Sequence, residues 1–264
     1  MATVTAFDAR TPSIARVYDY LLGGKDNFAA DRAVAEKLLA VYPPIAETVP
    51  ESRRFVERAV TWLAGQRDII QFIDLGAGLP TAPNTHETAQ QADPAATVAY
   101  VDNDPVVVSH LRELLAHHNE RVAVVSADLC DSDAILADPR LTSVIDLNKP
   151  VCVTMGMILH FFTAEAAADL VKRYLSAVAP GSYLVATVAS AKGPLADTFY
   201  ETYNAGGFAT MYNHSSARFA AFFDGLEIMP PGLADARRIR PGWNDLVPSR
   251  KRPDRVLAGI ARVP

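Results

Sequence analysis

The chain has 264 residues, of which 50% are apolar and 21% are charged. This composition supplies a large core and excludes disordered, collagen-like and disulfide-stapled proteins. The 25 basic and 30 acidic side chains leave a net charge of −5. That balance argues against a general binder of nucleic acid or of anionic membranes and favours a small or neutral partner.

The cellular compartment is indicated by two features. The first residues, MATVTAFDARTPS, contain no apolar stretch typical of a signal peptide, and no later apolar window is long enough to span a membrane. The two cysteines, Cys130 and Cys152, form no Cys-x-x-Cys pair, so we interpret them as small core residues in a reducing compartment. We expect a cytoplasmic protein.

The amino-terminal part of the chain predicts helices only. The first runs from Thr11 to Gly24, because Thr11 is a suitable N-cap and Pro12 suits a first turn. A second runs from about Asp31 to Ala40, and a third begins near Pro50. The third helix turns an apolar side inward, formed by Phe55, Val56, Ala59, Val60 and Leu63. We therefore predict a helical cap over residues 1–65 and a second domain over residues 66–264.

After residue 68, short apolar runs alternate with helical patterns. The runs predict strands at 69–75, 97–101, 122–126, 151–155, 183–188, 226–229 and 256–261. Helices are predicted at 85–91, 105–117, 163–178, 194–204 and 215–223. Near-continuous apolar strands separated by helices indicate a doubly wound α/β fold with a mostly parallel, seven-stranded, Rossmann-like sheet. The proline-dense segment 230–253 predicts a long ordered loop.

A glycine turn follows the first strand, where a doubly wound sheet binds its ligand. It reads FIDLGAGLPT, and Gly76 and Gly78 allow a ligand to lie against the backbone. A dinucleotide fingerprint needs a third glycine where Thr81 stands, so this turn is poorly suited to binding a pyrophosphate. Asp74, two residues before Gly76, repels phosphates and favours a cationic cofactor. The alternative is an ordinary tight turn.

Acidic residues also follow the next two strands. Asp102 is placed to accept hydrogen bonds from both hydroxyls of a ribose, whereas Asp104 is better explained as the N-cap of the helix that begins with Pro105. Asp128, after the third strand, is placed to accept from an adenine amino group. These acids together describe an adenosyl pocket, although both residues of the pair 102 and 104 could be simple turn or cap residues.

These motifs resemble those of class I methyltransferases that use S-adenosylmethionine. More narrowly, the segments SIARVYDYLLGGKDNFAAD, FIDLGAGLPTAPNTHETAQ, YVDNDPVVVSHLRELL and FFDGLEIMPPG are similar to the actinobacterial S-adenosyl methyltransferase family, over essentially the whole chain. The resemblance implies the cofactor S-adenosylmethionine, held by Gly76, Gly78, Asp102 and Asp128. With the neighbouring residues of the turns, the strand ends and the first helix, the cofactor site we expect comprises Asp74, Gly76, Ala77, Gly78, Asp102, Asn103, Asp128, Leu129, Gly156 and Tyr18. Pro80 departs from the general class I pattern, which often has a third glycine there.

The residue that would assist methyl transfer is less evident. His160 follows the fourth strand and is our candidate general base toward a small-molecule acceptor; the alternative is a packed histidine that hydrogen-bonds a backbone carbonyl. His86 could contact the cofactor, or cap a helix or lie on the surface. His117, His118 and Asn119 end a helix and predict no metal site. Rival functions are a nicotinamide-dependent oxidoreductase and a non-catalytic adenosyl-ligand sensor.

The first helix and a basic loop complete the candidates. Tyr18, Tyr20 and Phe28 could roof the cofactor, and the glycine pair at 23–24 suits a hinge, so residues 1–40 are interpreted as a lid; ordinary packing is the alternative. The segment from Arg237 to Arg255 carries a net charge of +5, from seven basic and two acidic residues. It is interpreted as a solvated loop, with an anionic acceptor site as the alternative.

Overall fold

The computed structural model describes residues 8–115, 120–248 and 256–264. Its described residues form one sheet with strand order β3-β2-β1-β4-β5-β8-β6, and a short eighth strand, β7, pairs with β8. The first five strands of this order are parallel, and β8 is antiparallel to both of its neighbours. The strands are β1 (Gln71–Leu75), β2 (Thr97–Asp102), β3 (Val122–Ser126), β4 (Cys152–Gly156), β5 (Tyr183–Ala189), β6 (Glu227–Ile228), β7 (Ala234–Asp235) and β8 (Val256–Arg262).

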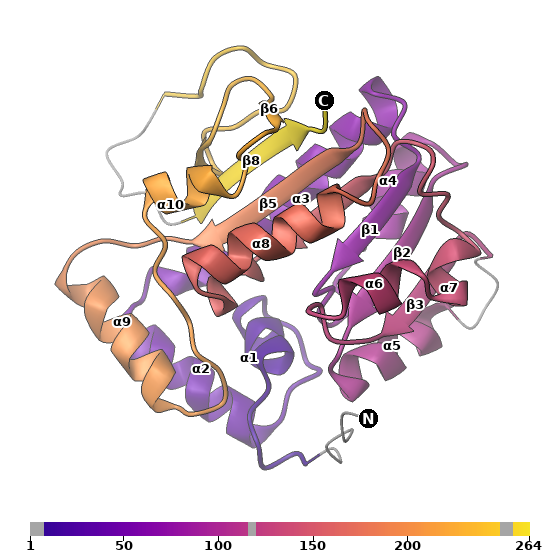
Figure 1. Ribbon diagram of the computed structural model, residues 1–264. Helices are drawn as coiled ribbons and strands as arrows, with labels where there is room; N and C mark the ends of the chain where they lie inside the picture. The colour runs from indigo at the N-terminus through magenta and orange to yellow at the C-terminus, as the bar shows by residue number, and fades with distance from the viewer. Residues whose placement is uncertain (1–7, 116–119, 249–255) are drawn as a thin grey trace.

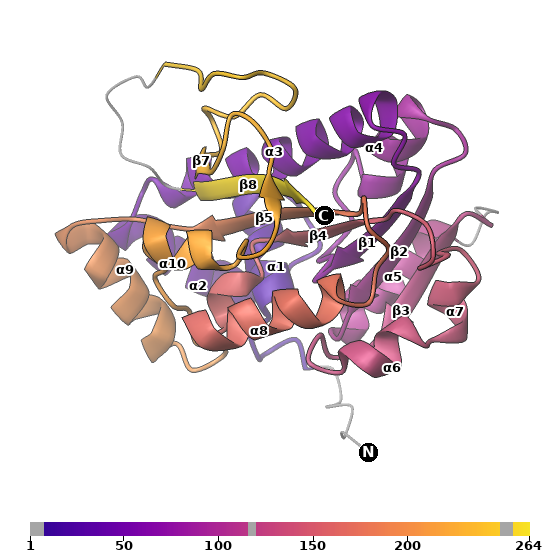
Figure 2. The ribbon, with the colours of Figure 1, turned by 45° about the horizontal axis from the view of Figure 1, so that its top comes forward.

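Helices cover both faces of the sheet (Figures 1 and 2), as the doubly wound prediction required. The helices are α1 (Ile14–Leu21), α2 (Ala29–Val41), α3 (Ile45–Gln66), α4 (Thr85–Ala92), α5 (Pro105–Leu115), α6 (Ser132–Leu136), α7 (Pro139–Thr142), α8 (Ala164–Leu175), α9 (Pro194–Ala205) and α10 (Ser216–Ala221). Helices α3, α4 and α5 pack into one core cluster, and α6, α7, α8 and α10 into the other.

Strand alternation explains why both faces are apolar. In β1, Phe72 belongs to the cluster under α3, whereas its neighbour Ile73 belongs to the cluster under α8. Every residue of β1 is buried, because successive side chains of a central strand enter opposite cores. The apolar runs in the sequence are therefore the mark of strands covered on both sides.

The amino-terminal helices divide into two groups. Helices α1 and α2 pack with α9 in a third cluster that includes Val17, Leu38 and Phe199. Helix α3 joins this cluster only through its first turns, at Ile45 and Val49; the rest packs on β4, β5 and β8, with Phe55 and Leu63 fully buried. The α1–α2 pair with α9 forms the cap, and α3 lies with the sheet although it precedes residue 66.

Several element boundaries differ from the sequence predictions. Helix α1 begins at Ile14 after Ser13, so Thr11 is not its N-cap. Helix α3 begins at Ile45 and contains Pro50; a proline this near the amino-terminal end removes one helical hydrogen bond, and burial of Ile45 and Val49 outweighs that loss.

The short elements were not predicted. Helices α6 and α7 have 5 and 4 residues and β7 has 2, too short to show a periodic pattern. The prediction for Cys130 as a core residue was wrong, because its side chain is exposed, whereas Cys152 is buried. Among the described residues, no helix has both the length and the apolar character needed to cross a membrane.

Candidate active site

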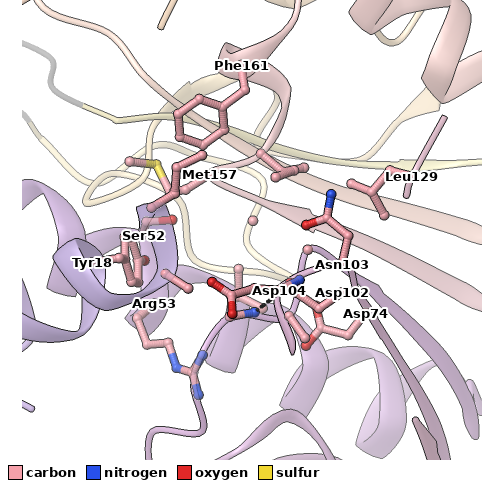
Figure 3. Close-up of a pocket in the computed structure, with 18 of the residues that line it drawn as sticks. Tyr18, Ser52, Arg53, Asp74, Asp102, Asn103, Asp104, Leu129, Met157 and Phe161 are labelled. Carbon is pink, nitrogen blue, oxygen red and sulfur yellow. Dashed lines mark hydrogen bonds between the residues drawn. The ribbon is translucent and has the colours of Figure 1, made fainter. Parts of the chain in front are cut away.

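A cavity of about 550 Å³ opens at the carboxyl ends of β1 to β4 and is closed on one side by α1 and α3. Its volume lies in the usual range for small-molecule sites, roughly 300 to 1,000 Å³. It is lined by every cofactor residue expected from the sequence: Tyr18, Asp74, Gly76, Ala77, Gly78, Asp102, Asn103, Asp128, Leu129 and Gly156. Figure 3 shows Tyr18 and Ser52 on one side of the cavity and Leu129 on the other.

The glycine turn brings bare backbone to the cavity wall. Gly76 and Gly78 have φ values of +68° and +67°, a region that favours glycine. A Cβ atom at Gly76 would lie 2.9 Å from the side chain of Ile158, whereas one at Gly78 would meet nothing within 4 Å. Gly76 is therefore needed for close packing, and Gly78 leaves space for a ligand.

The turn then departs from a dinucleotide site. Thr81 donates its N–H to Asn84 Oδ1 at 3.1 Å, and helix α4 starts only at Thr85. No helix N-terminus therefore stands directly behind the glycines to hold a pyrophosphate. The missing third glycine in the sequence therefore corresponds to a missing pyrophosphate site at this turn.

Asp102 ends β2 with both carboxylate oxygens directed at backbone N–H groups. Oδ2 accepts from Gly78 and Oδ1 accepts from Asp104, each at 2.9 Å. Burial raises the pKa of Asp102 to about 6, against the lowering effect of these hydrogen bonds. Each oxygen has a further lone pair, so the carboxylate can still accept from a ligand hydroxyl.

The carboxylate of Asp104 has two hydrogen-bond partners. Its Oδ1 accepts the Val106 N–H at 2.8 Å, the capping contact expected at the start of α5. Its Oδ2 accepts the hydroxyl of Ser13 at 2.6 Å. The second contact ties the beginning of α1 to the end of β2, directly beside Asp102.

Asp74 is a buried carboxylate held by two threonines. Thr154 and Thr85 donate their hydroxyls to Oδ1 and Oδ2, each at 2.6 Å. Desolvation raises its pKa, and the two hydroxyls and the charge of Arg53 oppose that rise. Asp74 thus joins β1 to β4 and α4 while contributing negative charge to the cavity wall.

A polar network at the end of β4 links α3 to β5. The Ser52 and Thr187 hydroxyls lie 2.7 Å apart, and Thr187 Oγ1 also accepts the N–H of Met157 at 3.0 Å. Met157 has φ +58°, an uncommon conformation for a bulky residue. The network therefore holds Met157 in place at the cavity wall.

The sequence profile of a family described as S-adenosyl methyltransferase matches residues 2–264. The chain belongs to this S-adenosyl methyltransferase family. A candidate methyltransferase from Thermobifida fusca YX is 37% identical with a TM-score of 0.90, over 97% of this chain and 96% of that chain. A DUF574 family protein from Streptomyces avermitilis MA-4680 is 34% identical with a TM-score of 0.89, over 97% and 99%.

The mitomycin 7-O-methyltransferase MmcR shares the fold at 14% identity and a TM-score of 0.52, over 98% of this chain and 74% of that chain. A search of curated proteins gave no match. The protein is therefore a methyltransferase that uses S-adenosylmethionine, and the rival oxidoreductase interpretation is not supported. The open backbone at Gly78 and the remaining acceptor capacity of Asp102 fit this cofactor.

The methyltransferase cavity includes residues that the sequence interpretation missed. Ser52 and Arg53 on α3 line it, as do Phe161, Phe162 and Phe208. Arg53 donates from Nη2 to the carbonyl oxygens of Thr81 and Pro83. Both residues lie inside the predicted third helix, and helical spacing places Ser52 on the same face as Val56, which the sequence predicted to turn inward. The local pattern does not show that this face meets a cavity at the strand ends.

The histidine candidates lie apart from this cavity. His160 is 2% exposed, its Nδ1 accepts the Ala189 N–H at 3.4 Å, and burial lowers its pKa to about 3. This geometry favours the alternative of a packed histidine over a general base, although its partner is a backbone N–H and not the backbone carbonyl that was expected. His86 is also buried, and its Nδ1 lies 2.8 Å from the Tyr100 hydroxyl.

Among the aromatic residues proposed as a roof, only Tyr18 lines the cavity. Tyr20 donates to Glu36 Oε1 at 3.2 Å, and Phe28 is 38% exposed. A buried ion pair of 2.8 Å between Arg16 and Asp31 holds α1 to α2. The roof of the methyltransferase site is therefore one face of α1.

The turn after α1 is more tightly bonded than a free hinge. Asp19 Oδ2 accepts from the N–H of Asp26 and from the side chain of Asn27, and a Cβ at Gly24 would lie 2.0 Å from Asp19. Gly24 is thus required by the close approach of this carboxylate.

The remaining sequence candidates are a histidine pair and a basic loop. His117, His118 and Asn119 lie outside the described residues, and the described ranges contain no cluster of three or more possible metal ligands. In the described part of the basic loop, Arg237 pairs with Asp235 at 2.7 Å and Arg238 donates to the Val247 carbonyl. This part is an ordered loop with internal contacts.

Proposed function

We propose that this methyltransferase modifies a small molecule and binds S-adenosylmethionine in the cavity at the strand ends. The observation that supports this best is that one cavity collects the glycine turn, Asp102, Asp128 and Gly156 from four separate strand ends. The fold is shared with a mitomycin O-methyltransferase, a relative named for a small-molecule substrate. The cavity size supports the same class.

In this proposal the residues act in order along the sheet edge. Asp128 and Leu129 lie at the adenine end, Asp102 accepts from the ribose hydroxyls, and the backbone at Gly76 to Gly78 lies along the methionine part. Arg53, whose guanidinium carries five N–H donors, lies on the methionine side and binds the α-carboxylate. Asp74 balances positive charge within the wall.

The chain contributes alignment and exclusion of water. S-adenosylmethionine supplies a methyl group already activated by its sulfonium, so positioning can provide most of the rate. Helix α1 covers the cavity through Ile14 and Tyr18, and the Ser13 contact to Asp104 holds that cover over the ribose site. The described part of the amino-terminal segment, residues 8–40, acts as the lid.

Calorimetry tests the proposal directly. We expect S-adenosylhomocysteine to bind at micromolar or lower concentrations and NADH to give no heat. Saturable NADH binding without S-adenosylhomocysteine binding would refute the cofactor site. Tight cofactor binding with no turnover across a broad panel of small acceptors would instead support a sensor.

A further inference from the structure

A second, smaller cavity of about 60 Å³ lies next to the first, between the cap helices and the end of β5. The two cavities share Ile14, Tyr18, Met157 and Phe161 in their walls. Figure 3 shows Tyr18, Met157 and Phe161 together on the side of the larger cavity opposite Leu129. The small cavity therefore adjoins the methionine side of the site and is remote from the adenine side.

The walls of the small cavity carry no formal charge. No Asp, Glu, Lys or Arg lines it, and its imidazole, His160, is neutral because burial lowers its pKa to about 3. Burial also raises the pKa of Tyr18 to about 12, and the phenols of Tyr200 and Tyr203 shift upward for the same reason. A charged group placed here would lose its hydration without gaining a partner.

The position of Met157 connects this chemistry to the site. Met157 follows Gly156 at the carboxyl end of β4, in a left-handed conformation held by hydrogen bonds to Thr187. Its side chain stands between a polar cavity with several carboxylates and an apolar one. A substrate that reaches the methyl donor from this side must have an apolar end.

We propose that the small cavity is the acceptor subsite, and that the acceptor is an uncharged molecule whose apolar end inserts between α1 and α9. This inference rests on the proposed cofactor site. A cavity of 60 Å³ is smaller than the roughly 150 Å³ that accommodates benzene in an apolar interior. The subsite therefore takes a few non-hydrogen atoms, and the nucleophilic part of the acceptor lies at the shared wall.

The transfer needs no further reagent. The acceptor's lone pair forms the bond to the methyl carbon while the carbon–sulfur bond breaks and its electron pair stays on sulfur. The acceptor's own proton is then released to bulk solvent when the methylated product leaves.

Matched phenols test the inference on the full chain saturated with S-adenosylhomocysteine, whose binding is measured first by calorimetry. Ligand-observed NMR compares 4-methylphenol with 4-hydroxybenzoate and 4-hydroxybenzylamine, which carry a negative and a positive charge at the same position. We expect 4-methylphenol to bind at least tenfold more tightly than either. Equal or tighter binding of a charged partner, or no binding of 4-methylphenol, would overturn the subsite.

Two variants change the volume of the subsite only. Ala191→Leu fills it, because Ala191 lines the small cavity and not the large one; we expect at least tenfold weaker 4-methylphenol binding with S-adenosylhomocysteine affinity unchanged within twofold. Val49→Ala enlarges it and should shift preference toward 4-propylphenol. Val98→Ala, at a buried position of β2 that lines neither cavity, is the control and should change neither preference.

These outcomes separate the two proposals. Loss of S-adenosylhomocysteine binding in the unmodified chain refutes the proposed cofactor site and the subsite with it. Normal S-adenosylhomocysteine binding without preference for the uncharged phenol, or with a preference that survives in Ala191→Leu, refutes the acceptor subsite alone.

Discussion

The two ends of the site are built in different ways. The adenosyl end lies on strand ends and short turns, where Asp102 and the glycine turn are bonded to neighbouring backbone groups. The acceptor end lies between α1, α3 and α9, which are far apart in sequence and meet through apolar side chains. The first region is polar and locally encoded, whereas the second is apolar and depends on how the cap docks. Cofactor recognition and acceptor selection can therefore be changed separately.

The largest effect should come from Asp102. Asp102→Ala is expected to weaken S-adenosylhomocysteine binding by about 1.5 to 3 kcal/mol, the loss of hydrogen bonds to a charged group, as measured by calorimetry. The companion variant Asp102→Asn should unfold at the same temperature or higher, since an ionised carboxylate with a raised pKa destabilises the fold at pH 7. Unchanged S-adenosylhomocysteine affinity in both variants would show that another residue binds the ribose hydroxyls.

Arg53 tests the other end of the cofactor. Arg53→Gln is expected to weaken S-adenosylhomocysteine by about 1 to 3 kcal/mol through loss of a charge-assisted contact. The affinity of 5′-methylthioadenosine, which has the adenosine part but no carboxylate, should stay the same in this variant. An equal loss for both ligands would mean that Arg53 acts by holding the turn at Thr81 and Pro83.

The titration of Asp102 predicts that cofactor binding at the adenosyl end depends on pH. With a pKa of about 6 in the folded protein, the carboxylate accepts hydrogen bonds above that pH and is protonated below it. S-adenosylhomocysteine affinity should therefore fall as the pH drops from 7.5 to 5, by at most about tenfold per unit below the pKa. The Asp102→Asn variant should lack this dependence, and a wild-type curve that is flat over this range would contradict the assignment.

The same upward shift of the Asp102 pKa has the opposite effect on the stability of the ligand-free protein. Because the folded pKa lies above the ordinary value of 3.8, the native state binds the proton more tightly than the unfolded chain. The contribution of Asp102 to the free energy of unfolding is therefore largest at low pH and is lost as the pH rises through about 6.

One contact that ties α1, a wall of the acceptor end, to the adenosyl end is the hydrogen bond from Ser13 to Asp104. Ser13→Ala is expected to weaken cofactor binding by about 0.5 to 1.5 kcal/mol, because α1 is then held less firmly over the cavity. Hydrogen exchange of residues 14–28 should be faster in this variant and should slow when S-adenosylhomocysteine is added. Exchange that ignores both the substitution and the ligand would show that α1 is fixed packing and not a lid.

The difference between the regions also explains what could be predicted from sequence. Asp102 and Gly78, which line the cavity, were expected at the site because a doubly wound sheet places its ligand at strand ends, a rule that needs only the order of strands and turns. Ser52 and Arg53 were missed although they lie inside the predicted third helix, because only tertiary packing brings this part of α3 to the cavity at the strand ends. The start of α3 was also misplaced, since burial of Ile45 and Val49 extends the helix to the amino-terminal side of Pro50. Local propensity yields to tertiary packing at such positions.

The direction of the His160 side chain at the acceptor end could not be predicted for the same reason. His160 follows a strand and so satisfied the rule that found Asp102. Its direction depends on contacts with Ala189 and with the Tyr212 N–H, which its own carbonyl accepts, and those segments lie 29 or more residues away. No local pattern reports that the side chain enters the core.

The smallest expected effect on catalysis is therefore at His160. If the imidazole only packs and accepts the Ala189 N–H, His160→Gln should keep the turnover number within about threefold, well short of the 10²- to 10⁴-fold that a general base contributes. The glutamine amide can still accept that N–H, so loss of stability should be modest, and Tm measured in parallel separates folding from chemistry. Once an acceptor is known, the dependence of log kcat on pH between 5 and 9 is compared in the two proteins. A fall in turnover of tenfold or more, with unchanged Tm and unchanged S-adenosylhomocysteine affinity, would show that His160 is the general base. If the profile is the same in both proteins, His160 transfers no proton. The acceptor end of this methyltransferase then acts through its shape and its apolar walls alone.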